Sequence, residues 1–349
     1  MALFEVTAND RRIYEEELRD FLPEKIIDVH AHVWLDHLKV KDPNEPKRTV
    51  TWTQVVALDD SIEDLQETYQ LLFPGKEVSA LFFANGEGEG NNQYVSQSSQ
   101  KTGWPALYFS HPSETAEELE EHIRSGGFLG VKSYLSLSPK YIPGPEVRIF
   151  DFFPKHQLAV LDRMGAIMML HIPRNGRLKD PVNLAQIAEI KEEFPNIRLI
   201  VAHIGRAYVE SDIGNAFDTL DKYPTLMYDF CANCCDIAIE TCLRHAGPKH
   251  LMFGLDMPIL RLRTHRIEEN GTYINLVPPG IYGDLGGDPH MREVSPEEGE
   301  KITFFAYEEL LAFRRVAEKL GLSREDVEDI MYRNAKNLID GARKSIYGI

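Results

Sequence analysis

Eight short apolar runs recur along the chain, and most of them are followed by a segment with helical spacing. The runs are residues 26–34, 78–84, 107–109, 129–135, 166–171, 197–203, 226–230 and 251–254. Apolar runs of this length that alternate with amphipathic helices indicate parallel strands buried on both faces. Eight such units predict an α/β fold, a (β/α)₈ TIM barrel. A doubly wound open sheet is the alternative, and the lack of a Gly-x-Gly-x-x-Gly fingerprint after any strand counts weakly against it.

The segments with helical spacing lie between and after these strands, at 10–21, 60–72, 115–124, 151–164, 184–194, 213–222, 237–245, 301–320 and 323–339. The second strand is followed instead by a glycine-rich loop, residues 85–90. Ser323 and Asp326 predict a capping box at the start of the last helical segment. The helices and strands together predict one continuous barrel.

A chain of 349 residues is long enough for one large barrel or two ordinary domains, and we expect one domain over residues 1–349. We place the barrel core at about 25–258 and C-terminal helices at about 300–340. Two long insertions, 35–52 and 257–297, follow the first and the eighth strand. Long loops are usually functional or disordered, so both insertions are candidates for choosing the substrate at the mouth of the barrel.

The charge of the chain limits its partners. A formal net charge of −17 argues against nucleic acid, because phosphate binding requires a basic surface. The first residues lack the apolar core of a signal peptide, and no run approaches the roughly 20 apolar residues of a membrane helix. The four cysteines lie within residues 231–242 and are not a disulfide framework. We therefore expect a cytoplasmic protein with a small-molecule partner, and a homo-oligomer is left open.

Polar side chains close several of the apolar runs. His30 and His32 end the first strand, and residues i and i+2 of a strand point to the same face. Other strand ends offer Lys132, His171, His203 and Asp256. The C-terminal ends of barrel strands meet at one mouth, where active sites lie. Imidazoles and a carboxylate converging there form a plausible site for a divalent transition metal, most simply zinc.

The residues at these strand ends resemble the amidohydrolase superfamily. The matching motifs are Asp28-Val29-His30-Ala31-His32, Leu170-His171, Val201-Ala202-His203-Ile204-Gly205, Phe253-Gly254-Leu255-Asp256-Met257-Pro258 and the closing helix at 329–338. They look most like the amidohydrolase-related branch that contains aminocarboxymuconate-semialdehyde decarboxylase. The resemblance covers about residues 25–340. It implies a (β/α)₈ barrel with a metal at its mouth, although His-x-His alone is a weak signal.

Carried over residue by residue, the resemblance implies four metal ligands: His30, His32, His171 and Asp256. It places His203 beside them, as a second ligand or a catalytic base. Lys132 occupies the position where two-metal members carry a carboxylated lysine, but the one-metal branch often has Gly-Val-Lys here too. We expect one metal, and Lys132 to pair with an acidic substrate or with a carboxylate such as Asp229.

Four residues are candidates for contacts with the substrate. Arg174 and Arg206 each follow a predicted site histidine by three residues, and arginine holds carboxylates with two parallel hydrogen bonds. The structural alternative for each is an exposed arginine at a helix start. Lys132 and Trp34 are the other candidates, and Trp34 is more often expected in the core than in a pocket.

The predicted function is hydrolysis of an amide, ester or lactone bond of a small, carboxylate-bearing substrate by a metal-activated water. Asp256 would take the proton of the water and pass it to the leaving group, while His203 and the metal would stabilise the oxyanion. Non-oxidative decarboxylation at the same site is the alternative. A non-catalytic, metal-binding barrel is the third hypothesis.

Overall fold

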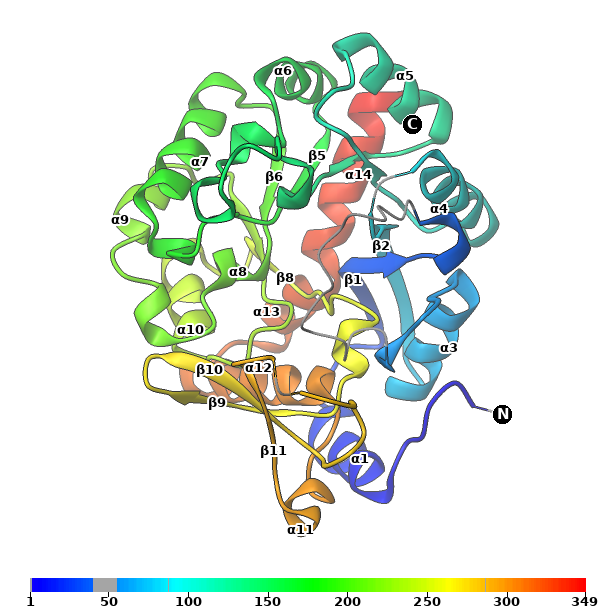
Figure 1. Ribbon diagram of the computed structural model, residues 1–349, viewed down its shortest axis with the longest axis vertical. Helices are drawn as coiled ribbons and strands as arrows, with labels where there is room; N and C mark the ends of the chain where they lie inside the picture. The colour runs from blue at the N-terminus through cyan, green and yellow to red at the C-terminus, as the bar shows by residue number, and fades with distance from the viewer. Residues whose placement is uncertain (1, 40–54, 87, 286) are drawn as a thin grey trace.

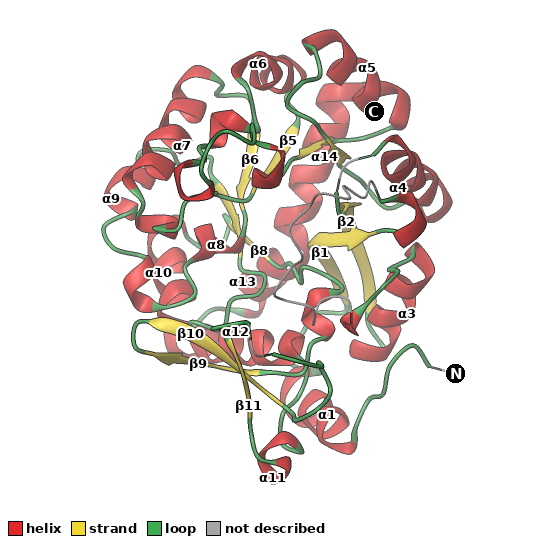
Figure 2. Cartoon of the chain, in the orientation of Figure 1, coloured by secondary structure: helices red, strands yellow, loops and turns green. Residues whose placement is uncertain are grey.

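The computed structural model describes residues 2–39, 55–86, 88–285 and 287–349 of the chain. Parallel strands lie at its centre and helices surround them (Figures 1 and 2). The central strands are β1 (Lys25–Val33), β2 (Glu77–Ala84), β3 (Tyr108–Phe109), β4 (Gly130–Lys132), β5 (Ile167–Leu170), β6 (Arg198–Val201), β7 (Met227–Asp229) and β8 (Leu251–Met252). From β3 to β8, each strand pairs in parallel with the next one along the chain.

The ring of strands is closed through β1 and β2, which also pair in parallel. A parallel bridge between Phe82 and Ala106 joins β2 to the segment that begins β3. On the other side, the His32 N–H donates to the Met257 carbonyl at 2.9 Å, which joins β1 to the segment after β8. The predicted (β/α)₈ barrel is confirmed, and the open sheet is excluded.

The interior of the barrel is apolar, and α14 (Asn334–Tyr347) closes its N-terminal end. Val29 of β1 and Phe83 of β2 belong to one buried inner cluster with Leu338 of α14. The Asn334 amide donates to the carbonyl of Leu251 at 2.8 Å, at the start of β8. Figure 1 shows α14 crossing behind the strands. The C-terminal ends of the strands therefore lie at the end that α14 leaves open.

Several helices begin with side-chain caps. Ser323 and Asp326 form the predicted capping box, in which the Asp326 N–H donates to Ser323 Oγ at 3.1 Å. The remaining helices are α1 (Ala8–Ile13), α3 (Ile62–Leu72), α4 (Glu89–Thr102), α5 (Ala116–Gly126), α6 (Lys155–Met164), α7 (Pro181–Glu193), α8 (His203–Arg206), α9 (Phe217–Leu220), α10 (Asp236–Ala246), α11 (Pro296–Gly299), α12 (Phe305–Leu320) and α13 (Arg324–Glu328).

The sequence prediction missed α4, because it ended the second unit in a glycine-rich loop. The helix is polar and lacks the apolar stripe that marks an amphipathic helix. Asn92 docks it instead: its amide donates to the Phe109 carbonyl at 3.0 Å and its Oδ1 accepts the Phe109 N–H at 2.8 Å. A buried side-chain amide that pairs with backbone supplements the apolar contact of Val95 with the core, and periodicity does not reveal it.

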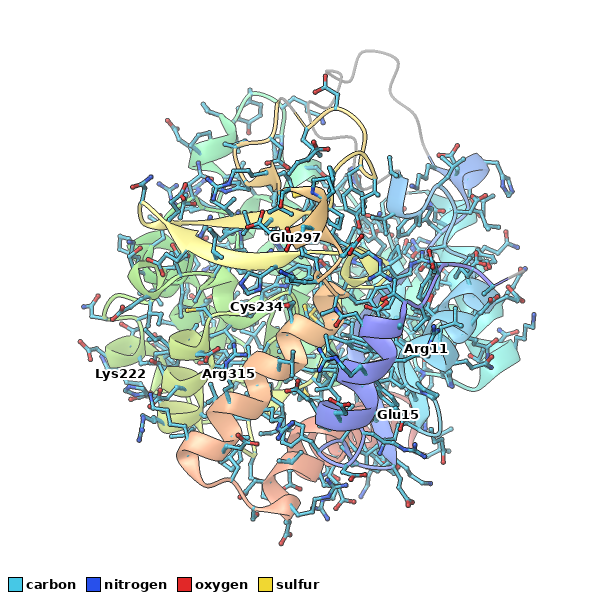
Figure 3. The ribbon with its side chains drawn as sticks, turned by 90° about the horizontal axis from the view of Figure 1, so that it is seen from below. Arg11, Glu15, Lys222, Cys234, Glu297 and Arg315 are labelled. Carbon is cyan, nitrogen blue, oxygen red and sulfur yellow. The ribbon has the colours of Figure 1, made fainter. Side chains whose placement is uncertain are left out.

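The insertion after β8 contains a small sheet that was also not predicted. It consists of β9 (His265–Glu269), β10 (Thr272–Val277) and β11 (Met291–Glu293). Asn270 and Gly271 both have positive φ and connect β9 to β10, as expected for the Asn-Gly turn of a β-hairpin. Figure 3 shows this hairpin next to α12, which lies beside α1. The Asn270-Gly271 dipeptide could therefore have predicted this hairpin from the sequence.

Of the predicted insertion 35–52, residues 40–52 lie outside the described residues. Among the residues that are described, no helix is both long and apolar enough to cross a membrane.

Candidate metal centre

β1 carries a bulge where its histidines begin. The parallel register with β2 shifts between Asp28 and Ala31. Val29 belongs to the inner cluster of the barrel, whereas Ala31 packs in the outer core with the helices. His30 and His32 consequently both lie on the inner face, with ring centroids 5.6 Å apart. Bulges beside functional sites redirect side chains in this way.

The buried carboxyl of Asp28 holds this bulge in place. Its Oδ1 accepts the N–H of His30 at 2.8 Å and the N–H of Leu255 at 3.0 Å, and its Oδ2 accepts the Tyr69 hydroxyl at 2.8 Å. Burial raises the pKa of Asp28 to about 8. Because Leu255 precedes Asp256, one carboxyl ties the end of β1 to the loop after β8.

The side chains of His30, His32 and Asp256 come together beyond the bulge. His30 Nδ1 lies 3.1 Å from Asp229 Oδ2, and His32 Nδ1 lies 3.3 Å from the Ala84 carbonyl. Asp229 can only accept, so we assign the His30 proton to Nδ1 and leave its Nε2 unprotonated. His32 has an acceptor at each ring nitrogen, and its Nε2 is free to bind a metal when the proton stays on Nδ1. These Nε2 atoms lie 3.6 Å and 3.1 Å from the same oxygen, Asp256 Oδ1.

His32 Nε2 and Asp256 Oδ1 can share a proton, which a divalent metal would replace. Burial raises the pKa of Asp256, but the bond to His32 and the nearby His30 and His203 outweigh it and hold the pKa below its usual range. The carboxylate is therefore ionised at neutral pH. Two neutral imidazoles and a carboxylate are a donor set that fits zinc and similar divalent metals.

The chain after β6 takes a left-handed turn at residues 203–206. The four φ angles are 58°, 48°, 60° and 59°, and this conformation costs roughly 1–2 kcal/mol per non-glycine residue. A Cβ at Gly205 would lie 2.5 Å from a Leu178 methyl carbon, so a larger residue there would displace Leu178. The first N–H of the turn, from His203, donates to Asp229 Oδ1 at 2.7 Å. The Asp229 carboxylate therefore holds this strained turn in place.

The imidazole of His203 faces the other histidines, with its ring centroid 4.8 Å from that of His30 and 5.2 Å from that of His171. Its Nδ1 lies 3.0 Å from the Cys231 carbonyl and therefore carries the proton. Burial, followed by the nearby His30, lowers the pKa of His203 to about 4. The unprotonated Nε2 suits a ligand or a base, whereas it lacks the proton that an oxyanion-stabilising donor needs.

His171 follows β5 and lies at the edge of the cluster. Its ring centroid is 5.2 Å from that of His203 and 5.1 Å from that of Tyr134. It does not belong to the tight group of three ligand atoms around Asp256 Oδ1. Its buried Nδ1 has no hydrogen-bond partner in the described part of the chain, and burial lowers the pKa of His171 well below its usual value. The His171 ring is therefore neutral and is available to bind a metal.

Two further buried residues, which the sequence analysis did not count among the metal ligands, contact these histidines. Asp229 and Cys231 form a second group of potential ligand atoms with His30 and His203. Cys231 Sγ lies 2.9 Å from His203 Nδ1, and burial raises the pKa of this thiol far above its usual value. A neutral thiol is a poor metal ligand. An aspartate inside an apolar strand run was the available signal for Asp229.

Lys132 is enclosed beside the cluster and is only 2% exposed. Its Nζ lies 5.4 Å from the Phe83 ring centroid and 5.9 Å from that of Tyr134. Burial lowers the pKa of Lys132 to about 8, against the opposing charges of Asp256 and Asp229. Within the described residues it has no ion pair, so the suggested pair with Asp229 is not formed.

The two predicted arginines differ in their partners. Arg174 Nε lies 3.2 Å from Asp180, which already occupies its guanidinium. Arg206 donates only to backbone carbonyls, of Ile172 at 3.3 Å and Pro173 at 3.4 Å, and forms no ion pair within the described residues. Arg206 is consequently the better placed of the two to receive an external carboxylate.

Trp34 is buried, at 3% exposure, and its indole N–H donates to the Leu58 carbonyl at 2.7 Å. Lys39 Nζ lies 4.5 Å from the centroid of the buried Trp34 ring. An aromatic wall comes instead from a residue that was not predicted. The ring centroid of Tyr208 lies 6.2 Å from that of His203 and 5.2 Å from that of Tyr273, which belongs to β10 of the insertion.

The cysteines form no disulfide: all four are free. Cys234 lies between the β9–β10 hairpin and α12, close to Arg315 (Figure 3). Burial raises the pKa of Cys234 well above its usual value. Two of these thiols are buried and two are half-buried.

A family model described as amidohydrolase matches residues 27–340. Among solved structures, an amidohydrolase from Burkholderia multivorans with bound HEPES has a TM-score of 0.60 and 13% identity, covering 90% of this chain and 99% of that one. A probable 2-pyrone-4,6-dicarboxylic acid hydrolase from Acinetobacter baumannii with bound citric acid has a TM-score of 0.55 and 15% identity, with coverage of 90% and 99%. A 5-carboxyvanillate decarboxylase from Novosphingobium aromaticivorans with bound manganese has a TM-score of 0.54 and 11% identity, with coverage of 91% and 97%. No curated protein matches the sequence.

Proposed function

The chain belongs to the amidohydrolase family, and we propose that it is a metal-dependent hydrolase of a small, carboxylate-bearing substrate. The bond cleaved would be an amide, ester or lactone. The observation that carries this proposal is the convergence of His30 Nε2, His32 Nε2 and Asp256 Oδ1 at the mouth of the barrel. These atoms would hold one divalent metal, with His171 as a fourth ligand from the edge of the cluster.

A bound divalent metal lowers the pKa of a bound water to about 7 and polarises a carbonyl. The donor set suits zinc, and the solved decarboxylase of this fold carries manganese, so metal identity is part of the proposal. The residues of the chain supply the remaining chemistry.

Asp256 is the residue best placed to move protons. Its side chain is 21% exposed, whereas that of His30 is 1% exposed, so a water or a substrate can approach Asp256. Its lowered pKa keeps it ionised and ready to accept the proton of the attacking water. It would then deliver this proton to the leaving group, as general acid–base catalysis requires. His203 would act as an acceptor beside it, through its unprotonated Nε2.

Arg206 would hold the carboxylate of the substrate, because its guanidinium has no carboxylate partner in the described chain. Lys132 would add a second positive charge near the cluster. Desolvated cations of this kind favour an anionic substrate over a neutral one of the same shape. Arg174 is the weaker candidate because Asp180 already binds it.

Non-oxidative decarboxylation is the second candidate. It is favoured by Arg206 and Lys132, two cations that form no ion pair within the described residues. A substrate with two acidic groups could place one on Arg206 and lose the other as CO₂ near Lys132, after which Asp256 would relay a proton from water to the substrate carbon. Solved structures of this fold include both hydrolases and decarboxylases.

The test is a metal analysis of protein purified without added metal, followed by a screen of lactones, esters, amides and aromatic carboxylates. Release of acid without CO₂ supports the hydrolase. Release of CO₂ supports the decarboxylase. Bound metal with no turnover across the screen supports a non-catalytic metal-binding barrel.

A further inference from the structure

Asp229, the last residue of β7, is a fully buried carboxylate with both oxygens engaged. Oδ2 lies 3.1 Å from His30 Nδ1. Oδ1 accepts the N–H of His203 at 2.7 Å and the N–H of Cys231 at 3.3 Å. One side chain therefore contacts the ring of one site histidine and the backbone of another.

We propose that Asp229 is a positioning residue that fixes the tautomer of His30 and anchors the left-handed turn that carries His203. One carboxylate would thus orient both the metal ligand His30 and the neighbouring acceptor His203. The inference rests on the metal centre in the proposed function and on no particular reaction.

The tautomer follows from what a carboxylate can do in a hydrogen bond. An ionised Asp229 only accepts, so His30 must place its proton on Nδ1. The Nε2 lone pair is then exposed toward Asp256, where a metal would bind. An amide at position 229 could turn its NH₂ toward His30 Nδ1. His30 would then carry its proton on Nε2, which would point a donor at the position that a metal needs.

The anchoring of the turn can be separated from the tautomer by choice of substitution. In Asp229→Asn the amide oxygen still accepts the N–H of His203, so the turn is retained while the tautomer of His30 changes. In Asp229→Ala both functions are lost. Asp28→Asn is the matched control, because Asp28 is also a buried aspartate bound to His30 but contacts its backbone N–H and not its ring.

The first measurement uses metal-free protein with ¹⁵N-labelled histidine, in which imidazole nitrogen shifts distinguish protonated from unprotonated nitrogens. Wild-type protein and Asp28→Asn should carry the His30 proton on Nδ1, and Asp229→Asn should carry it on Nε2. Asp229→Ala, but not Asp229→Asn, should also shift the backbone amide of His203. A wild-type His30 with its proton on Nε2 would overturn the proposal, and this spectrum decides even if the variants do not fold.

The second measurement is titration with Co²⁺, followed by absorbance. Loss of an outer partner of a metal-ligating histidine typically weakens metal affinity 10–100-fold, and we expect a loss of this size in Asp229→Asn. Unchanged Co²⁺ affinity in that variant contradicts the proposal. A thiolate-to-cobalt charge-transfer band would also contradict it, because the metal would then lie on Cys231 and Asp229 itself. Neither measurement uses a substrate, so failure of the proposed reaction leaves this result standing, and failure here leaves the reaction untested.

Discussion

Glu309 of α12 offers the sharpest test of the electrostatics beneath the site. The side chain is fully buried, and neither carboxyl oxygen has a hydrogen-bond partner in the described part of the chain. The backbone amides of Ala232 and Asn233 lie nearby without forming well-aligned hydrogen bonds. Burial raises the pKa of Glu309 well above its usual value, and the neighbouring Asp28 carboxyl adds to this shift when it ionises. The folded protein therefore holds a neutral glutamic acid.

The sign of the pH dependence follows from this shift. Unfolded, Glu309 ionises above a pKa of about 4.3, whereas folded it stays protonated to a much higher pH. Its contribution to stability is complete below the unfolded-state pKa and is lost as pH rises toward the folded-state pKa. The loss is about 1.4 kcal/mol per pH unit over that range. Glu309→Gln keeps the volume of the side chain and removes this loss.

The expected size can be expressed as a melting temperature. An unfolding entropy of about 2.1 cal/mol/K per residue gives about 0.7 kcal/mol/K for 349 residues. The Tm of Glu309→Gln should therefore gain about 2 °C on wild type with each pH unit from 5 to 7. Burying the glutamine amide should change the Tm by the same amount at every pH, so it does not affect the dependence of the Tm difference on pH.

Circular dichroism melts at several pH values provide the measurement. Glu318→Gln is the control, because Glu318 lies on the same helix with its side chain 61% exposed. The difference between this control and wild type should stay flat with pH. Parallel curves of Tm against pH for wild type and Glu309→Gln would refute the inference that Glu309 is neutral in the folded protein.

Three further predictions concern the site. Asp256→Asn should lower turnover by about 10²–10⁴-fold while metal content, measured by elemental analysis, changes far less; equal losses would make Asp256 only a ligand. Arg206→Gln should raise the KM of a carboxylate substrate about 10–100-fold, the size expected for a charge-assisted hydrogen bond, and Arg174→Gln should have a smaller effect; the reverse order would contradict the assignment. Fully loaded protein should contain one metal per chain, and Lys132→Ala should leave that number unchanged; two equivalents lost together would show a two-metal centre.

Much of the site could be predicted because the geometry of a parallel barrel does the positioning. Once the strands are placed, the residues at their C-terminal ends must share one mouth. His30, His32, His203 and Asp256 were found in this way, and the structure brings them into one cluster. His171 is also present, but at the edge of that cluster.

The missed features depend on contacts between segments that are distant in the sequence. The bulge in β1 is held by Asp28 through Leu255, more than two hundred residues away. The role of Asp229 depends on His30 and on the turn after β6. An aspartate within an apolar run is a visible anomaly, but a sequence does not show which partner satisfies it. The placement of Trp34 in the core is likewise decided by tertiary packing.

Backbone strain supports the location of the site independently of its side chains. In the described chain, five of the seven non-glycine residues with positive φ follow β6, β7 or β8, namely His203, Ile204, Arg206, Ala232 and Asp256. At roughly 1–2 kcal/mol each, their cost is comparable with the whole stability of an ordinary domain, about 5–15 kcal/mol. Strain of this size persists only where surrounding contacts determine it, and it typically collects at functional sites. The anchoring bond from Asp229 to His203 is one such contact, so the buried carboxylates stabilise a backbone that packing alone would let relax.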